Sequence, residues 1–345
     1  MAIGSWRLGR RGFLASLSAG VAGLAAQATP LTANDNEGIA QPSPRPGSAR
    51  RPATYTYKTV GNLEIKADIF RPDDASRRPV LLWIHGGGLI RGYRMDINPR
   101  IKTSFLNAGY AIVSIDYRLA PETKLPQIID DLRDAYTWLH DKGPRLFNVD
   151  TNRIAVAGDS AGGYLTLMTG FCVKPRPAVL VSLWGYGDIT GDWYTKPSTF
   201  YRGKYPLIAK DDAWKLVSGP PLTNRSFSDQ GSRRFYLYCR QQGLWTTNVS
   251  GFDLRTTDRS LTPYCPARNV TKEYPPTLLI HGTDDTDVPH DQSVQMDKEL
   301  TRTGVAHRFI SAPHAGHDLR GGDPKQVAAA YAAALQFVEG QIKAS

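Results

Sequence analysis

Residues 153–173 read RIAVAGDSAGGYLTLMTGFCV and carry the pattern of a strand, a tight turn and a helix. The apolar run 153–157 is typical of a buried strand, and 160–173 has apolar residues at helical spacing. Between them lies a G-x-S-x-G sequence, which places a serine on a strained strand-to-helix turn with its Oγ exposed. Glycine two residues before and after Ser160 removes side chains that would collide there. We predict Ser160 as a nucleophile, with an ordinary helix N-cap as the alternative.

Other segments of the chain repeat the alternation of strand and helix. Helical periodicity covers 125–139 and 326–342, and these helices separate several apolar runs. The runs are residues 79–84, 111–115, 178–183, 277–280 and 307–310. Near-continuous apolar runs suit strands that are buried on both faces of a parallel sheet. The pattern predicts a doubly wound, mostly parallel α/β sheet.

An antiparallel hairpin precedes the parallel strands. Residues 55–60 and 63–70 alternate, and Gly61-Asn62 lies between them as a turn.

Three glycines follow the strand 79–84 in the sequence His85-Gly86-Gly87-Gly88. Glycines without side chains let backbone N–H groups approach a ligand closely. The N–H of Ala161, at the start of the helix after Ser160, supplies another donor. We predict an oxyanion-binding loop here, with a flexible glycine turn as the alternative.

A serine nucleophile needs a base and an acid that orients the base, and both candidates lie late in the chain. Three aspartates follow the strand 277–280: Asp284, Asp285 and Asp287. Two histidines, His314 and His317, follow the strand 307–310. Ligands bind at the carboxyl ends of strands in open α/β sheets. The residues alone leave the choice within each group open.

These motifs resemble those of the α/β-hydrolase superfamily, most of all carboxylesterases of the hormone-sensitive-lipase and feruloyl-esterase-like type. The resemblance rests on residues 85–88, on 158–163 and on the sequence DYRLAPE at 116–122. It covers about residues 53–343 and implies an α/β-hydrolase fold with a cap-like insertion.

The resemblance also implies roles for single residues. The pattern HG-x-x-D-x-x-V-P puts the acid on Asp285, and A-G-H puts the base on His317. The second and third glycines of the HGGG sequence, Gly87 and Gly88, match the oxyanion donors. The implied chemistry is acyl transfer to water through an acyl-serine, with no metal or cofactor.

An insertion at about 184–270 interrupts the alternation. Residues 184–264 hold 15 of the 34 aromatic residues. Long insertions between core strands are usually functional, so we predict a lid or binding wall. Trp184, Tyr186 and Trp193 lie nearest the strand end and are predicted to bind substrate. The alternative is that the rings pack a small core of the insertion.

The first 52 residues are predicted to lie outside the fold. Residues 1–28 have the three parts of a signal peptide: arginines, an apolar stretch at 13–26 and the sequence Ala-Gln-Ala at 26–28. Arg10-Arg11 makes the leader similar to a twin-arginine signal, with an ordinary Sec signal as the alternative. Residues 29–52 are predicted as a flexible linker. The expected location is the periplasm or the exterior of a bacterium.

Composition excludes several classes of protein. The 345 residues include 42 basic and 32 acidic ones, a net charge of +10, and the basic residues are scattered, so we expect no nucleic-acid partner. No apolar run reaches the ~18 residues of a membrane span, and we expect no stable membrane anchor. Among three cysteines, Cys239 and Cys265 are the expected pair if a disulfide forms. No Cys/His cluster suggests zinc.

The sequence thus predicts an exported serine carboxylesterase for small to medium esters, either small molecules or linked to carbohydrate. Two alternatives stay open. One is a serine peptidase of the prolyl-oligopeptidase type, and the other is a hydrolase-like binding protein without turnover. The oligomeric state is left open.

Overall fold

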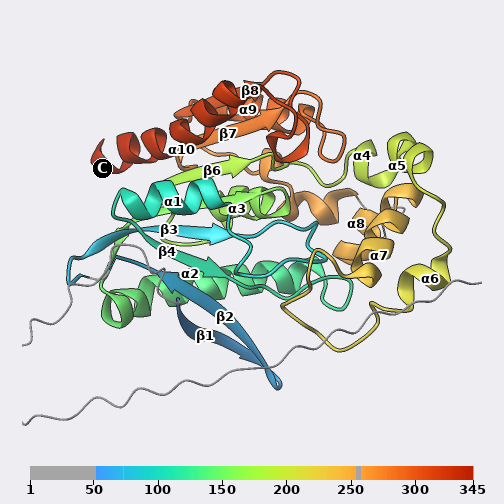
Figure 1. Ribbon diagram of the computed structural model, residues 1–345, viewed down its shortest axis with the longest axis horizontal. Helices are drawn as coiled ribbons and strands as arrows, with labels where there is room; N and C mark the ends of the chain where they lie inside the picture. The colour runs from blue at the N-terminus through green and yellow to red at the C-terminus, as the bar shows by residue number, and fades with distance from the viewer. Residues whose placement is uncertain (1–51, 73, 254–257, 345) are drawn as a thin grey trace, which may run out of the picture. The chain divides into compact units, whose positions relative to one another are not determined.

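The computed structural model describes residues 52–72, 74–253 and 258–344 (Figure 1). The predicted signal peptide and nearly all of the predicted linker lie outside these residues. In the described part of the chain, every helix is too short or too polar to cross a membrane.

A single sheet of eight strands forms the centre of residues 53–344. Its order is β1-β2-β4-β3-β5-β6-β7-β8. The strands are β1 (Ala53–Val60), β2 (Leu63–Phe70), β3 (Arg78–Ile84), β4 (Ala111–Ile115), β5 (Val149–Asp159), β6 (Val179–Leu183), β7 (Thr277–Gly282) and β8 (His307–Ala312). β2 pairs antiparallel with β1 and β4, and the neighbours from β4 to β8 are parallel. The predicted hairpin and mostly parallel sheet are confirmed.

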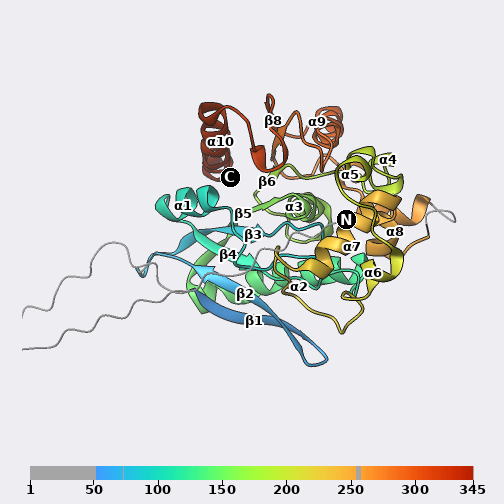
Figure 2. The same ribbon diagram turned by 45° about the vertical axis from the view of Figure 1, so that its right-hand side comes forward.

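Helices cover both faces of this sheet (Figure 2). One face carries α1 (Pro99–Asn107) and α10 (Pro324–Ala344), and the other carries α2 (Leu125–Phe147), α3 (Ala161–Cys172) and α9 (Asp291–Thr303). β3 shows why such strands read as continuous apolar runs. From Val80 to Ile84 its side chains alternate between the two cores and are fully buried in both. The predicted doubly wound α/β class is therefore confirmed.

The segment between β6 and β7 forms the insertion. It contains α4 (Asp192–Thr195), α5 (Thr199–Lys204), α6 (Lys210–Trp214), α7 (Gln230–Gln242), α8 (Trp245–Ser250), η1 (Asp258–Tyr264) and η2 (Pro266–Arg268). Helices α4 to α8 gather beyond the carboxyl ends of the parallel strands (Figure 1). Many of the insertion's rings pack against one another: Tyr194, for example, stacks on Trp245 with ring centroids 3.9 Å apart.

Cys239 and Cys265, the expected pair if a disulfide forms, are not bonded to each other, and all three thiols are free. The two thiols are directed to different partners. Cys239 Sγ accepts a hydrogen bond from Asn248 Nδ2 (3.4 Å), and Cys265 Sγ donates to Asp188 Oδ1 (3.5 Å). Burial raises the pKa of each thiol to about 12, so both stay protonated near neutral pH.

Candidate active site

Ser160 lies on the turn between β5 and α3 in a strained conformation. Its φ is 52° and its ψ is −118°, outside the regions that side chains other than glycine favour. The flanking glycines make the turn possible. A Cβ on Gly158 would lie 2.5 Å from the carbonyl oxygen of Ile84, and one on Gly162 only 2.0 Å from it. The sequence therefore folds here only because both positions lack a side chain.

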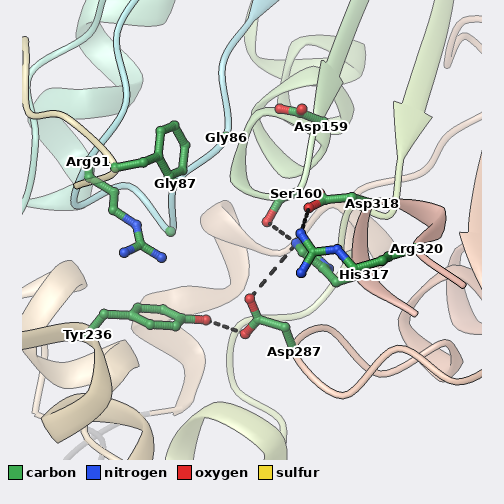
Figure 3. Close-up of a pocket in the computed structure, with 12 residues that line it drawn as sticks. Gly86, Gly87, Arg91, Asp159, Ser160, Tyr236, Asp287, His317, Asp318 and Arg320 are labelled. Atoms are coloured by element: carbon green, nitrogen blue, oxygen red, sulfur yellow. Dashed lines mark hydrogen bonds and ion pairs between the residues drawn. The ribbon is translucent and has the colours of Figure 1, made fainter. Parts of the chain in front are cut away.

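The three residues predicted for catalysis meet in one hydrogen-bonded row. His317 Nε2 lies 3.1 Å from Ser160 Oγ (Figure 3). On the other side of the ring, His317 Nδ1 lies 2.7 Å from Asp285 Oδ2. Ser160 follows β5, Asp285 follows β7 and His317 follows β8, so the sheet brings the ends of three strands together. A serine, an imidazole and a buried carboxylate in this order form the arrangement that activates a hydroxyl for attack.

The structure also separates the rival acids and bases. Asp284 and His314 lie near each other on the surface, with 59% and 90% of their side chains exposed, and neither lines the pocket. Asp287 lies in the pocket, with Oδ2 3.8 Å from His317 Nε2, on the side of the imidazole that faces Ser160. Of the three aspartates, only Asp285 contacts His317 Nδ1, the position of the orienting acid.

His281 is a positioning residue that the sequence prediction missed. Its ring is fully buried, with Nε2 3.2 Å from Asp285 Oδ2 and Nδ1 2.7 Å from Ser293 Oγ. The N–H groups of Asp287 and Val288 donate to the other oxygen of Asp285. Asp285 is thus fixed from several directions. The sequence feature that could have indicated this role is the position of His281, four residues before Asp285.

Hydrogen bonds and charges set the pKa values of this row. Burial on its own raises the pKa of Asp285, but hydrogen bonds from His281 and His317 outweigh it and hold that pKa well below its usual range. Burial lowers the pKa of His317, but the hydrogen bond to Asp285 and the negative charges of Asp287 and Asp285 raise it to about 9. His317 is therefore protonated below that pH.

The predicted oxyanion loop presents its backbone to Ser160. A Cβ on Gly86 would lie 3.3 Å from Ser160 Cβ, so the loop backbone runs against the nucleophile. The Gly86 carbonyl accepts from His85 Nδ1 (2.8 Å), and the Gly87 carbonyl accepts from Ile90 and Arg91 (3.1 Å each). In a trans peptide the N–H points away from the carbonyl, so the N–H groups of Gly87 and Gly88 point the other way.

Ala161 is the first residue of α3, so its N–H has no acceptor within the helix. The insertion helps to hold the loop, because Trp245 Nε1 in α8 donates to the Gly88 carbonyl (3.1 Å). Gly87 has φ +101° and Gly88 has φ +65°, conformations that favour glycine.

A pocket of about 260 Å³ opens above Ser160 and is mostly polar. It is lined by Gly86, Gly87, Gly88, Arg91, Asp159, Ser160, Phe227, Tyr236, Asp287, His317, Asp318 and Arg320 (Figure 3). Within the described residues, no group of three or more His, Cys, Asp and Glu side chains is placed to hold a metal ion.

The three aromatic residues predicted to bind substrate do not line this pocket, which corrects that prediction. Trp184 and Tyr186 are buried, and Trp193 packs edge-on against Tyr186 with centroids 5.1 Å apart. Trp184 supports the site from behind, with its ring edge-on to His317 at 6.2 Å. The aromatic side chains in the pocket are Phe227 and Tyr236, both farther along the insertion.

The pKa of His317 predicts the pH dependence of the reaction. A general base acts as the neutral imidazole, so kcat/KM for an uncharged ester is expected to rise with pH, with a midpoint near 9. Asp287→Asn removes one negative charge beside Nε2 and lowers the pKa of His317. The midpoint is then expected to move down by about one pH unit. Profiles of kcat/KM from pH 6 to 10.5 measure it.

Asp284→Asn is the matched control, because that carboxylate is exposed and outside the pocket. Asp287→Asn leaves the buried Arg240 without its 2.6 Å partner, so thermal unfolding must show that the variant is folded. The double variant with Arg240→Gln provides a second test, with a smaller shift in the same direction expected. An unchanged midpoint in folded variants contradicts the role of Asp287.

Two family models each match about a third of the chain. Residues 67–176 match the model described as BD-FAE, and residues 235–345 match the prolyl oligopeptidase family. The first match contains the glycine loop and Ser160, and the second contains Asp285 and His317. Together the two matches cover every residue of the catalytic row.

Solved structures share the fold of this chain. An alpha/beta hydrolase superfamily protein from Enterococcus faecalis is 22% identical, with a TM-score of 0.64 over 84% of this chain and 98% of that one. Esterase 2 of Thermogutta terrifontis, solved in a form phosphoramylated by tabun, is 17% identical, with a TM-score of 0.59 over 86% of this chain and 97% of that one.

A much longer protein also contains a similar region. The non-reducing polyketide synthase Preu3 of Preussia isomera is 28% identical over 317 residues, which cover 76% of this chain. The match takes up 12% of the synthase, so this chain corresponds to a small part of that protein.

Proposed function

We propose that this chain, which has the α/β-hydrolase fold, is a serine hydrolase of the carboxylesterase-like kind and hydrolyses small to medium carboxylic esters through an acyl-serine. The observation that carries this proposal is the row Asp285–His317–Ser160, which opens into a pocket beside the glycine loop.

The geometry supports a two-step acyl transfer. His317 takes the proton of Ser160 as Oγ attacks the ester carbonyl, and Asp285 holds the imidazole and stabilises its charged form. The N–H groups of Gly87, Gly88 and Ala161 donate to the oxyanion of the tetrahedral intermediate. The alcohol leaves with the proton from His317. Water then attacks the acyl-serine by the same route and releases the acid.

A serine peptidase is the second candidate, favoured by the match of residues 235–345 to the prolyl oligopeptidase family. The same catalytic row serves amide hydrolysis, so peptide substrates belong in the test. The hydrolase-like binding protein is disfavoured, because such proteins usually lack a catalytic residue and all three are present here.

We also propose that the chain is exported to the periplasm or beyond. The support is the leader in residues 1–28, with Arg10-Arg11 before the apolar stretch and Ala-Gln-Ala at its end. The natural ester is then one met outside the cytoplasm, either a small molecule or an acyl group on a carbohydrate.

One experiment tests both proposals. The full chain is expressed in a bacterium, and its N-terminus is determined after fractionation, with Thr29 expected in the exported fraction. The purified protein is then assayed on p-nitrophenyl esters from acetate to decanoate and on proline-containing peptide anilides. We expect ester hydrolysis that falls with chain length, because the pocket is small and polar. If the folded protein cleaves only the anilides, the esterase proposal is wrong and the peptidase is the better description of its activity.

A further inference from the structure

Arg91 is a positively charged side chain in the pocket. It follows the glycine loop and lines the same pocket as Ser160 (Figure 3). Its guanidinium lies over two aromatic rings, 5.3 Å from the centroid of Phe227 and 5.6 Å from that of Tyr236. Across the described ranges 52–72, 74–253 and 258–344, no carboxylate forms an ion pair with it.

Two acids of the pocket have arginine partners of their own. Asp287 pairs with Arg240 at 2.6 Å, and Asp318 pairs with Arg320 at 3.4 Å. Neither acid neutralises the charge of Arg91 at close range.

The third acid of the pocket, Asp159, lies against the glycine loop. Its Oδ1 would be 2.9 Å from a Cβ on Gly86, and burial raises its pKa to about 7. It is therefore partly protonated near neutral pH. Among the described acids of the pocket, none neutralises Arg91 at close range, so its positive charge is available to a substrate in the pocket.

Arg91 is also held in place. Its backbone N–H donates to the Gly87 carbonyl (3.1 Å), so its Cα is fixed to the oxyanion loop. Cation–π contact with two rings orients the plane of the guanidinium but uses none of its N–H groups. A guanidinium presents its N–H groups as a planar fork that fits a carboxylate with two parallel hydrogen bonds.

We propose that this pocket takes esters that carry an anionic group, a carboxylate above all, and that Arg91 determines this specificity by binding that group. Arg320 lies on the other side of Ser160 in Figure 3, and 84% of its side chain is exposed. Because Arg320 pairs with Asp318, it adds no unpaired positive charge to the site. The inference rests on the proposed ester hydrolysis and narrows its substrate class.

The test compares matched pairs of esters. On the alcohol side, 4-acetoxybenzoate is compared with 4-acetoxybenzamide. On the acyl side, mono(4-nitrophenyl) adipate is compared with its methyl ester. The quantity is the ratio of kcat/KM for the anionic and the neutral member, measured for the wild type and for Arg91→Gln. Intrinsic reactivity cancels when this ratio is compared between proteins.

We expect Arg91→Gln to lower the ratio by about 10- to 100-fold in at least one pair. Arg91→Lys keeps the charge without the fork and is expected to lose part of the preference. Arg145→Gln, an exposed arginine on α2 outside the pocket, changes the net charge equally and is expected to leave the ratio unchanged.

The two possible failures are distinct. In the first, the esters are hydrolysed, but the ratio of kcat/KM for the anionic and the neutral ester is the same in the wild type, Arg91→Gln and Arg91→Lys. This result overturns the role of Arg91 and does not affect the proposed esterase activity. A ratio that falls equally in Arg145→Gln also overturns it, because general charge then explains the effect. No hydrolysis of any ester by the folded wild type overturns the proposed function itself, and this inference with it.

Discussion

Ser160→Ala is expected to lower kcat for ester hydrolysis by about 10⁵- to 10⁶-fold, the loss typical of removing a serine nucleophile. The variant lacks the oxygen that forms the acyl bond. Among the described pocket-lining residues, the other hydroxyl is that of Tyr236, which already donates to Asp287. No other described residue of the pocket is placed to replace Ser160.

The loss must be separated from unfolding and from background activity. The variant loses one oxygen atom and its contact with His317, so the thermal unfolding midpoint is expected to stay close to that of the wild type. Ser228→Ala, on an exposed loop, is the matched control. A fluorophosphonate probe followed by intact mass analysis is expected to label the wild type once and Ser160→Ala not at all. Turnover above a hundredth of wild type, or a label on another residue, contradicts the assignment.

The elbow was predictable because its requirements are local. The backbone of Ile84 approaches so closely that Gly158 and Gly162 have no alternative, and the motif shows this in five residues. The choice among the acids was not local. Asp284 and Asp285 are adjacent, and the fold of the loop decides which one reaches His317. The family resemblance made that choice, and the geometry agrees with it.

The aromatic prediction failed because distance along the chain is a poor guide to place within a long insertion. Trp184 follows β6 directly, but its φ of 38° turns it into the core beside α10, edge-on to Tyr331. Phe227 and Tyr236 come more than forty residues later and reach the pocket through the path of the insertion. That path depends on contacts between distant segments, which periodicity does not encode.

Two helices outside the insertion, α1 and α9, were not predicted, for a different reason. α1 has nine residues and two buried apolar side chains, too few for a clear helical period. α9 buries Gln292 and Ser293 beside Met296 and Leu300, so half of its buried face reads as polar. The buried Ser293 serves the site, since it contacts His281 behind Asp285. The same buried serine therefore supports Asp285 through His281 and weakens the apolar pattern by which the helix could have been predicted.

His317→Ala is expected to cause a loss of kcat as large as that of Ser160→Ala, while His314→Ala stays within about threefold of the wild type. The reason is geometric. His317 is the side chain between Ser160 Oγ and Asp285 Oδ2, at 3.1 and 2.7 Å. His314 precedes it by three residues but has 90% of its side chain exposed and lies near Asp284 instead.

The pH profile distinguishes the loss of the general base from a structural disturbance of the site. If His317 is the base, the residual activity of His317→Ala no longer rises with a midpoint near 9, because the group that titrates there is gone. His317→Gln keeps much of the side-chain volume and is expected to be equally inactive. Free imidazole added at millimolar concentration is expected to restore some activity to His317→Ala only. A greater loss in His314→Ala than in His317→Ala overturns the assignment, because the proton of Ser160 must then leave by a route that this pocket does not contain.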